Sequence, residues 1–180
     1  MMLKRLSQMN WGLFVLAAGL SSCNSPISIS QPLPSETAPT PTASPKSTSR
    51  DLTNLELSVH QQINQYRQSR NLSPLTLDPR ISEQARLHSE AMASSRVSFS
   101  HDGFEGRVKA LEKSIPYRSA AENIAYNQGY SDPAKQAVEG WLQSPGHLKN
   151  IQGEFNLTGI GVTQNAKGEY YFTQIFLKGR

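Results

Sequence analysis

Four short polar stretches of the sequence carry residue types that do chemistry in proteins. They are "SFSHDGF" with His101, "AAENIAY" with Glu122, "VEGWLQS" with Glu139 and Ser144, and "SPGHLKN" with His147. Two histidines and a carboxylate suit a divalent metal or acid–base catalysis, because neutral imidazole donates a nitrogen ligand and the carboxylate supplies charge. The stretches are far apart in the chain, so surface or purely structural roles remain open.

Besides binding a metal or another ligand, these residues could form the active site of a hydrolase. It would use Ser144 with His147 as base and Glu122 orienting the imidazole, or a metal-activated water. The chain lacks a G-x-S-x-G nucleophile elbow, and Ser144 directly precedes Pro145 and Gly146, where it could belong to a turn. These features favour a binding module over an enzyme. A structural module, in which the polar residues only support the fold, is the third possibility.

Residues 1–23 predict an exported protein. A basic start precedes an apolar run over residues 11–20, and small residues lead to Cys23, as in a secretory signal. The letters LSSC that end this segment resemble a bacterial lipobox, which implies acylation of Cys23. We therefore expect a lipid anchor in a membrane of the bacterial cell envelope, or an extracellular protein if cleavage occurs without lipidation.

Residues 24–50 are rich in proline, serine and threonine and contain no aromatic residue, which predicts a disordered tether. Cys23 is the only cysteine, so the domain predicted for residues 51–180 contains no disulfide. That domain carries 14 Lys and Arg against 13 Asp and Glu, and this balance argues against nucleic-acid binding. Without heptad repeats, we expect a monomer.

Residues 51–180 alternate between helical and strand patterns. Apolar residues at every third or fourth position predict a first helix that ends near "RNLSP", and Asp78 and Pro79 begin a second one that runs to about Ser95. Shorter helices are expected over 106–114 and 132–144, the last one stopped by Pro145 and Gly146. "TGIGVTQ", "NAKG" and "EYYFTQIFLK" predict an antiparallel hairpin whose final strand is covered on both faces.

Helices in the first two thirds and strands at the end indicate an α+β domain. The expected architecture is a three-layer α-β-α sandwich with a central antiparallel sheet.

Six motifs in a fixed order resemble a known family. They are "ARLHSEAMA", "FSHDG", "AENIAY", "AVEGWLQSPGHLKNI", "FNLTGIGV" and "YYFTQIF". Over residues 52–177 the chain is similar to the CAP superfamily of cysteine-rich secretory proteins, insect venom antigens and plant pathogenesis-related proteins, especially its bacterial SCP-like branch. The resemblance implies the same sandwich, with a cleft lined by two histidines and two acids. Family members include lipid binders and metal binders.

By motif position the resemblance places His101, Glu122 and His147 in that cleft and implies that these three could hold a divalent metal such as zinc. Ser144 stands where the family's second acid falls, and Tyr171 stands where its strand histidine falls. Both are expected as polar neighbours in the cleft. The resemblance therefore implies a protein that binds a metal, or a small apolar or envelope ligand such as a lipid or a cell-wall fragment.

Two further polar residues are expected to lie outside the site. Helical spacing turns Glu139 away from the inward stripe of Ala134 and Trp141, which predicts that it faces solvent. His88 matches a family motif position, yet its place on the second helix predicts a packed structural histidine rather than a ligand.

Overall fold

The computed structural model describes residues 47–180. The predicted signal segment, the lipobox at Cys23 and nearly all of the predicted tether lie outside the described residues. Within residues 47–180, every helix is too short or too polar to cross a bilayer.

Five helices and four strands make up the part of the chain that the structure describes. In chain order they are α1 (Ser49–Ser69), β1 (Thr76–Leu77), α2 (Pro79–Ala93), α3 (Phe104–Glu112), β2 (Tyr117–Asn127), α4 (Pro133–Gln143), α5 (Pro145–Gln152), β3 (Leu157–Gln164) and β4 (Tyr170–Gly179).

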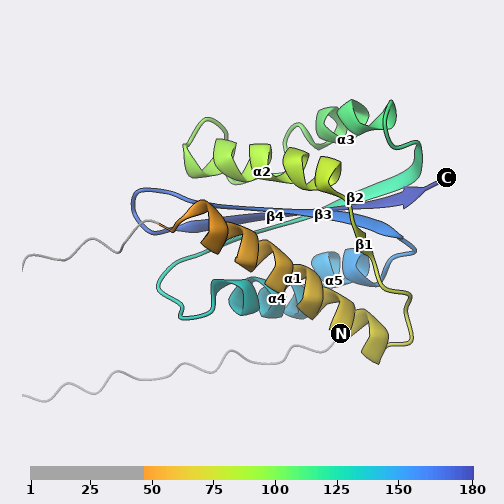
Figure 1. Ribbon diagram of the computed structural model, residues 1–180, viewed down its shortest axis with the longest axis horizontal. Coiled ribbons are helices and arrows are strands. Elements are labelled where there is room, and N and C mark those ends of the chain that lie inside the picture. The colour runs from red at the N-terminus through yellow and green to blue at the C-terminus, as the bar shows by residue number, and fades with distance from the viewer. Residues whose placement is uncertain (1–46) are drawn as a thin grey trace, which may run out of the picture. The chain divides into compact units, whose positions relative to one another are not determined.

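The four strands form one sheet in the order β1-β3-β4-β2. α2 and α3 cover one face, and α1, α4 and α5 cover the other (Figure 1). This confirms the predicted α+β class and its three layers. The sheet is mixed rather than wholly antiparallel, because the two-residue β1 pairs parallel with the start of β3.

Two hydrophobic clusters form the core, one on each face of the sheet. The cluster under α2 and α3 contains Ile81, Ala85, Val108, Leu111, Ile115, Ile175 and Leu177. The other cluster joins α1, α4 and α5 to the sheet and includes Val59, Ile63, Val138, Trp141, Ile151, Phe172 and Phe176. β4 is therefore buried on both faces, as its continuous apolar run predicts.

α2 lies directly on β3 because Gly161 has no side chain. A Cβ at Gly161 would meet the backbone of Ala85 and Arg86, and Gly159 approaches α2 in the same way. The two glycines therefore allow the backbone of α2 to approach β3 closely.

Side-chain caps set where the long helices begin. Thr48 and Asp51 form a capping box for α1, which starts two residues before the domain boundary predicted at residue 51. Ser47 is already tied to the domain, since its N–H donates to Gln164 Oε1 at 2.7 Å. Asp78 caps α2 as predicted and accepts from the Arg80 N–H.

Two elements near the site differ from the sequence prediction. Pro145 ends α4 but also begins α5, because a proline in the first helical turn has no N–H that needs a partner. β2 was not predicted from the sequence. Glu122 lies in the middle of this strand. Its stretch "YRSAAENIAYN" lacks the β-branched and aromatic alternation that identifies the final hairpin.

Candidate functional site

Glu122 is the buried centre of the site. It lies in β2, and only 2% of its side chain is exposed. Arg107 of α3 donates two hydrogen bonds to the carboxylate, from Nε to Oε2 at 3.0 Å and from Nη2 to Oε1 at 2.8 Å. A guanidinium that binds both oxygens offsets the cost of burying the negative charge.

His101 lies beside this ion pair in the loop between α2 and α3. Its Nδ1 donates to Glu122 Oε1 at 3.0 Å, while about half of the side chain (51%) stays exposed. When Nδ1 carries the hydrogen of a neutral ring, Nε2 keeps its lone pair and can act as a ligand. Gly103, with a φ of 76°, turns the chain into α3 and so lets His101 and Arg107 reach the same carboxylate.

His147 approaches His101 from α5, which covers the other face of the sheet (Figure 1). The two ring centroids are 6.4 Å apart and the ring planes make an angle of 50°. Burial lowers the pKa of His147, and the neighbouring His101 lowers it further. The ring is therefore neutral at pH 7. The two imidazoles meet at the outer edge of β2.

Two asparagines hold α5 against this edge. Asn123 Nδ2 donates to the carbonyl of His147 at 3.2 Å. Asn150 Nδ2 donates to the carbonyl of Glu122 at 3.2 Å and to Asn123 Oδ1 at 2.9 Å. Because neighbouring side chains of a strand point to opposite faces, Glu122 positions His101 on one face while Asn123 positions His147 on the other.

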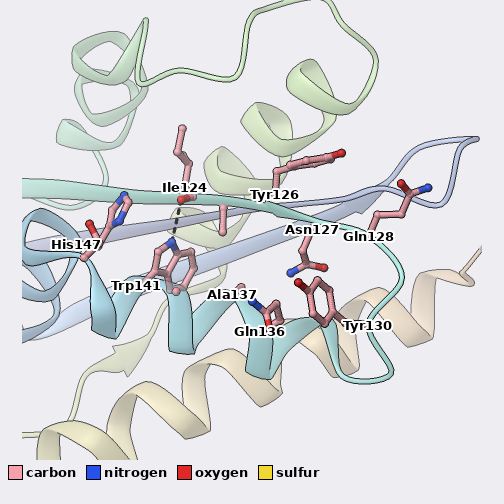
Figure 2. A pocket seen from close by; sticks show the side chains of 12 residues that line it. Ile124, Tyr126, Asn127, Gln128, Tyr130, Gln136, Ala137, Trp141 and His147 are labelled. Atoms are coloured by element: carbon pink, nitrogen blue, oxygen red, sulfur yellow. Dashed lines mark hydrogen bonds between the residues drawn. The ribbon is translucent and has the colours of Figure 1, made fainter. Parts of the chain in front are cut away.

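A cleft of about 530 Å³ begins at His147 and follows the outer edge of β2 (Figure 2). Its walls are the end of β2 and one side of α4. The lining residues are Ile124, Ala125, Tyr126, Asn127, Gln128, Tyr130, Gln136, Ala137, Gly140, Trp141, Ser144 and His147, none of which is Asp, Glu, Lys or Arg. Its volume is that of a small-ligand site.

The structure brings His101, Glu122 and His147 together, and it places Ser144 and Tyr171 differently. Ser144 lines the cleft with His147, whereas His101 and Glu122 lie beyond its end. Tyr171 does not line this cleft. Its place on β4 points it to the face covered by α2, where it packs on Tyr126 with ring centroids 5.3 Å apart.

The predicted hydrolytic triad is not assembled within residues 47–180. The carboxylate of Glu122 binds His101 and Arg107, so it does not orient His147. Ser144 is the residue between α4 and α5, and its side chain makes no cap bond there.

Within residues 47–180, neither His88 nor Glu139 makes a hydrogen bond or ion pair with His101, Glu122 or His147. His88 is 4% exposed, and its Nε2 donates to the carbonyl of Ser100 at 3.0 Å. Burial lowers the pKa of His88, and the charge of Arg107 adds to this effect. Glu139 is exposed on α4, where its carboxylate is 3.8 Å from Lys135 Nζ.

The fit to a metal ion is limited to the two histidines. Among residues 47–180 no group of three or more His, Cys, Asp or Glu side chains could hold a metal. Both oxygens of Glu122 are already bound, so the predicted ligand set of His101, Glu122 and His147 reduces to two imidazoles. Glu122 instead orients the His101 ring by accepting from its Nδ1.

Arg107, Asn123 and Asn150 are site residues that sequence reasoning missed. A buried acid needs a cationic partner, and Arg107 lies only six positions after His101 in the chain. That requirement would have indicated Arg107 once Glu122 was known to lie inside a strand. The two asparagines carry no comparable signal, because they bind backbone carbonyls and each other.

A family model described as "CAP: Cysteine-rich secretory protein family" matches residues 60–176. Over 148 residues the chain is 34% identical to the uncharacterized protein YkwD of Bacillus subtilis (strain 168), covering 81% of this chain and 54% of that protein.

Two solved structures are similar. An outer surface protein from Borrelia burgdorferi has a TM-score of 0.61 at 17% identity, with 75% of this chain and 98% of that chain covered. An extracellular protein containing a SCP domain from Bacillus anthracis str. Ames has a TM-score of 0.58 at 31% identity, with 75% and 45% covered. The chain thus spans about half the length of YkwD and of the Bacillus anthracis protein. The family match and the bacterial relative together show that the chain belongs to the CAP family, also called the cysteine-rich secretory protein family.

Proposed function

We propose that this protein is an exported CAP domain of the bacterial cell envelope that binds a ligand at the paired histidines and the adjoining cleft. The predicted secretory signal supports export, and the lipobox at Cys23 supports a lipid anchor in a membrane. Two similar structures are named as an outer surface protein and an extracellular protein, which agrees with this location.

The orientation of His101 carries the proposal. Arg107 holds the carboxylate of Glu122, and Glu122 accepts the Nδ1 hydrogen of His101. Nε2 of that ring is left with a lone pair that can act as a ligand, and the ring lies beside that of His147. A carboxylate behind an imidazole is the usual arrangement around metal-binding histidines, because it fixes the tautomer and raises the basicity of the ring.

Zinc is the metal that these two residues would suit best. His101 and His147 would hold it through neutral nitrogens, and a ligand in the cleft would supply further coordination. A bound zinc ion acts as a Lewis acid toward carbonyl or phosphoryl oxygens. With only two protein ligands, we expect weaker zinc binding than at a structural site with four.

Calorimetric titration of zinc into the full chain tests this function. Wild-type protein should bind zinc at pH 7.5 and more weakly at pH 5.5, since metal binding requires neutral imidazoles. The His101→Ala, His147→Ala double variant should lose the binding. His60→Gln is the matched control, because His60 contacts the carbonyl of Leu75 away from the site. Zinc binding that is unchanged in the double variant, or absent from wild type, would contradict the proposal.

A further inference from the structure

The two outer edges of the sheet are treated differently. One edge is formed by the two-residue β1 and by the part of β3 that extends past it. There side chains occupy outward N–H groups of β3: Ile160 N–H donates to Ser82 Oγ at 3.3 Å, and Val162 N–H donates to Glu56 Oε1 at 3.1 Å. Arg86 in turn binds both oxygens of Glu56. Ser82 of α2 and Glu56 of α1 thus block these N–H groups to a further strand, which is one way in which proteins prevent edge-to-edge pairing.

Along β2, the outward groups are satisfied only in part. The carbonyl of Glu122 accepts from Asn150, and the carbonyl of Ile124 accepts from Trp141 Nε1 at 2.8 Å (Figure 2). Every second residue of an antiparallel strand points both its N–H and its C=O away from the partner strand. The N–H of Ile124 and the N–H and C=O of Tyr126 therefore also point outward. Within residues 47–180 no strand or side chain bonds to them.

These free backbone groups border the cleft. Ile124 and Tyr126 both line it, and across from them α4 presents the small residues Ala137 and Gly140. A Cβ added at Gly140 would meet nothing within 4 Å. The cleft therefore leaves room for a chain beside the strand.

A buried acceptor also lines the cleft. Asn127 is 6% exposed, and its Nδ2 donates to the carbonyl of Pro133 at 2.9 Å. Its Oδ1 has no hydrogen-bond partner among the described residues. A buried amide oxygen without a partner is costly, but this atom has almost no exposed surface, so a ligand donor would reach it only after a shift of the Asn127 side chain.

We propose that the cleft binds an extended peptide, which adds to the outer edge of β2 as a further strand. This inference rests on the proposed ligand-binding function and names the class of ligand. A peptide backbone repeats donors and acceptors at the spacing of the free groups on Ile124 and Tyr126, as in other complexes where a strand is added to a sheet. The uncharged lining favours recognition of the main chain over that of charged side chains. At the His147 end, the peptide would reach the histidine pair.

A phage-displayed library of random linear heptapeptides, selected on the full chain, provides the probe. A selected peptide is then synthesised in two forms. One form carries N-methyl groups on its odd-numbered amides, and the other carries them on its even-numbered amides. An added strand uses only the amides that face β2, so one form should lose roughly tenfold in affinity and the other should keep it. Equal affinities of the two forms would overturn the proposal, as would a library from which no peptide is enriched.

Two matched variants locate the binding. Gly140→Trp places a large side chain in the cleft and should weaken the peptide roughly tenfold or more. Gly106→Trp makes the same change at an equally open glycine of α3, outside the cleft, and should leave affinity unchanged. Equal binding to both variants would contradict the proposed location.

The test separates this inference from the proposed function. Gly140→Trp leaves both histidines in place, so its zinc titration should match that of wild type. Zinc binding that depends on the histidines, without any peptide that responds to Gly140→Trp, would overturn only the peptide inference. A neutral sugar, the tetramer of N-acetylglucosamine, is titrated in parallel. Its binding in the cleft in place of peptides would assign the cleft to saccharides and overturn the inference.

Discussion

Arg107 and Glu122 form a bidentate ion pair in which both side chains are largely buried, at 12% and 2% exposure. The pair joins α3 to β2 and leaves one carboxylate oxygen to accept from His101 as well. The guanidinium therefore determines both the charge balance of the site and the direction of the His101 ring.

Replacing Arg107 by Met should destabilise the protein by about 3–5 kcal/mol, because it leaves the carboxylate of Glu122 buried with no cation. Urea denaturation at pH 7.5 measures the change. Adding Glu122→Gln should recover part of the loss. The exposed pair of Arg96 and Glu90 is the control, and Arg96→Ala should cost less than about 1 kcal/mol. Equal losses at Arg107 and Arg96 would contradict the role of the buried pair.

His88 should make the stability depend on pH. Burial lowers its pKa in the folded state below the ordinary value of 6.5, so the unfolded state binds protons more readily. The free energy of unfolding should therefore be highest above pH 6.5 and fall as the pH decreases below that value. His88→Gln keeps a donor for the Ser100 carbonyl but cannot titrate, so its stability should fall less between pH 7.5 and pH 5.5. Parallel losses in wild type and variant would show that His88 does not cause the effect.

Gly161 and Gly106 should respond oppositely to alanine. At Gly161 a Cβ would overlap the backbone of α2, and the forced separation should cost about 3 kcal/mol or more. At Gly106, which is exposed in α3 with open space around it, alanine should stabilise by about 0.5–1 kcal/mol through helix propensity. Thermal unfolding of both variants checks the contrast. A tolerated Gly161→Ala would show that α2 does not need its close approach to β3.

Glu56→Ala should open the β3 edge. It leaves the Val162 N–H without an acceptor and Arg86 without its carboxylate, and we expect a loss of about 1–3 kcal/mol with increased self-association. Size-exclusion chromatography at several protein concentrations detects the association. Glu139→Ala removes an exposed acid of α4 and should stay within about 0.5 kcal/mol of wild type. A Glu56→Ala protein that is as stable and as monomeric as Glu139→Ala would refute this function of the edge.

The sequence predicted the elements whose signals are local. Apolar periodicity and the cap at Asp78 identified α1 and α2, and the aromatic and β-branched residues of β3 and β4 identified the hairpin. β2 was missed because its sequence does not alternate between apolar and polar residues. The neighbouring polar residues Glu122 and Asn123 both bind groups of the helices, Arg107 of α3 and the carbonyl of His147 in α5. α5 was missed because Pro145 suits a helix start as well as a helix stop.

The site was predicted only as a set of residue types. Motif resemblance placed His101, Glu122 and His147 near one another, and the structure brings them together. The assignment of Glu122 as a metal ligand required knowing its partners, which come from α3 and from a loop. Tyr171 lies on the face of the sheet that α2 covers. Residue types alone could not predict this, because the face depends on the strand register.

The tautomer of His101 decides whether this ring can offer Nε2 to a ligand. Long-range ¹H–¹⁵N correlation spectra of the full chain at pH 7.5 distinguish which ring nitrogen carries the hydrogen. We expect a hydrogen on Nδ1 and a lone pair on Nε2. The Nε2 resonance should shift on addition of zinc, and in Glu122→Ala the hydrogen should no longer stay on Nδ1. A wild-type ring with its hydrogen on Nε2 would contradict the proposed ligand role of His101, because Glu122 would then not present His101 to a ligand.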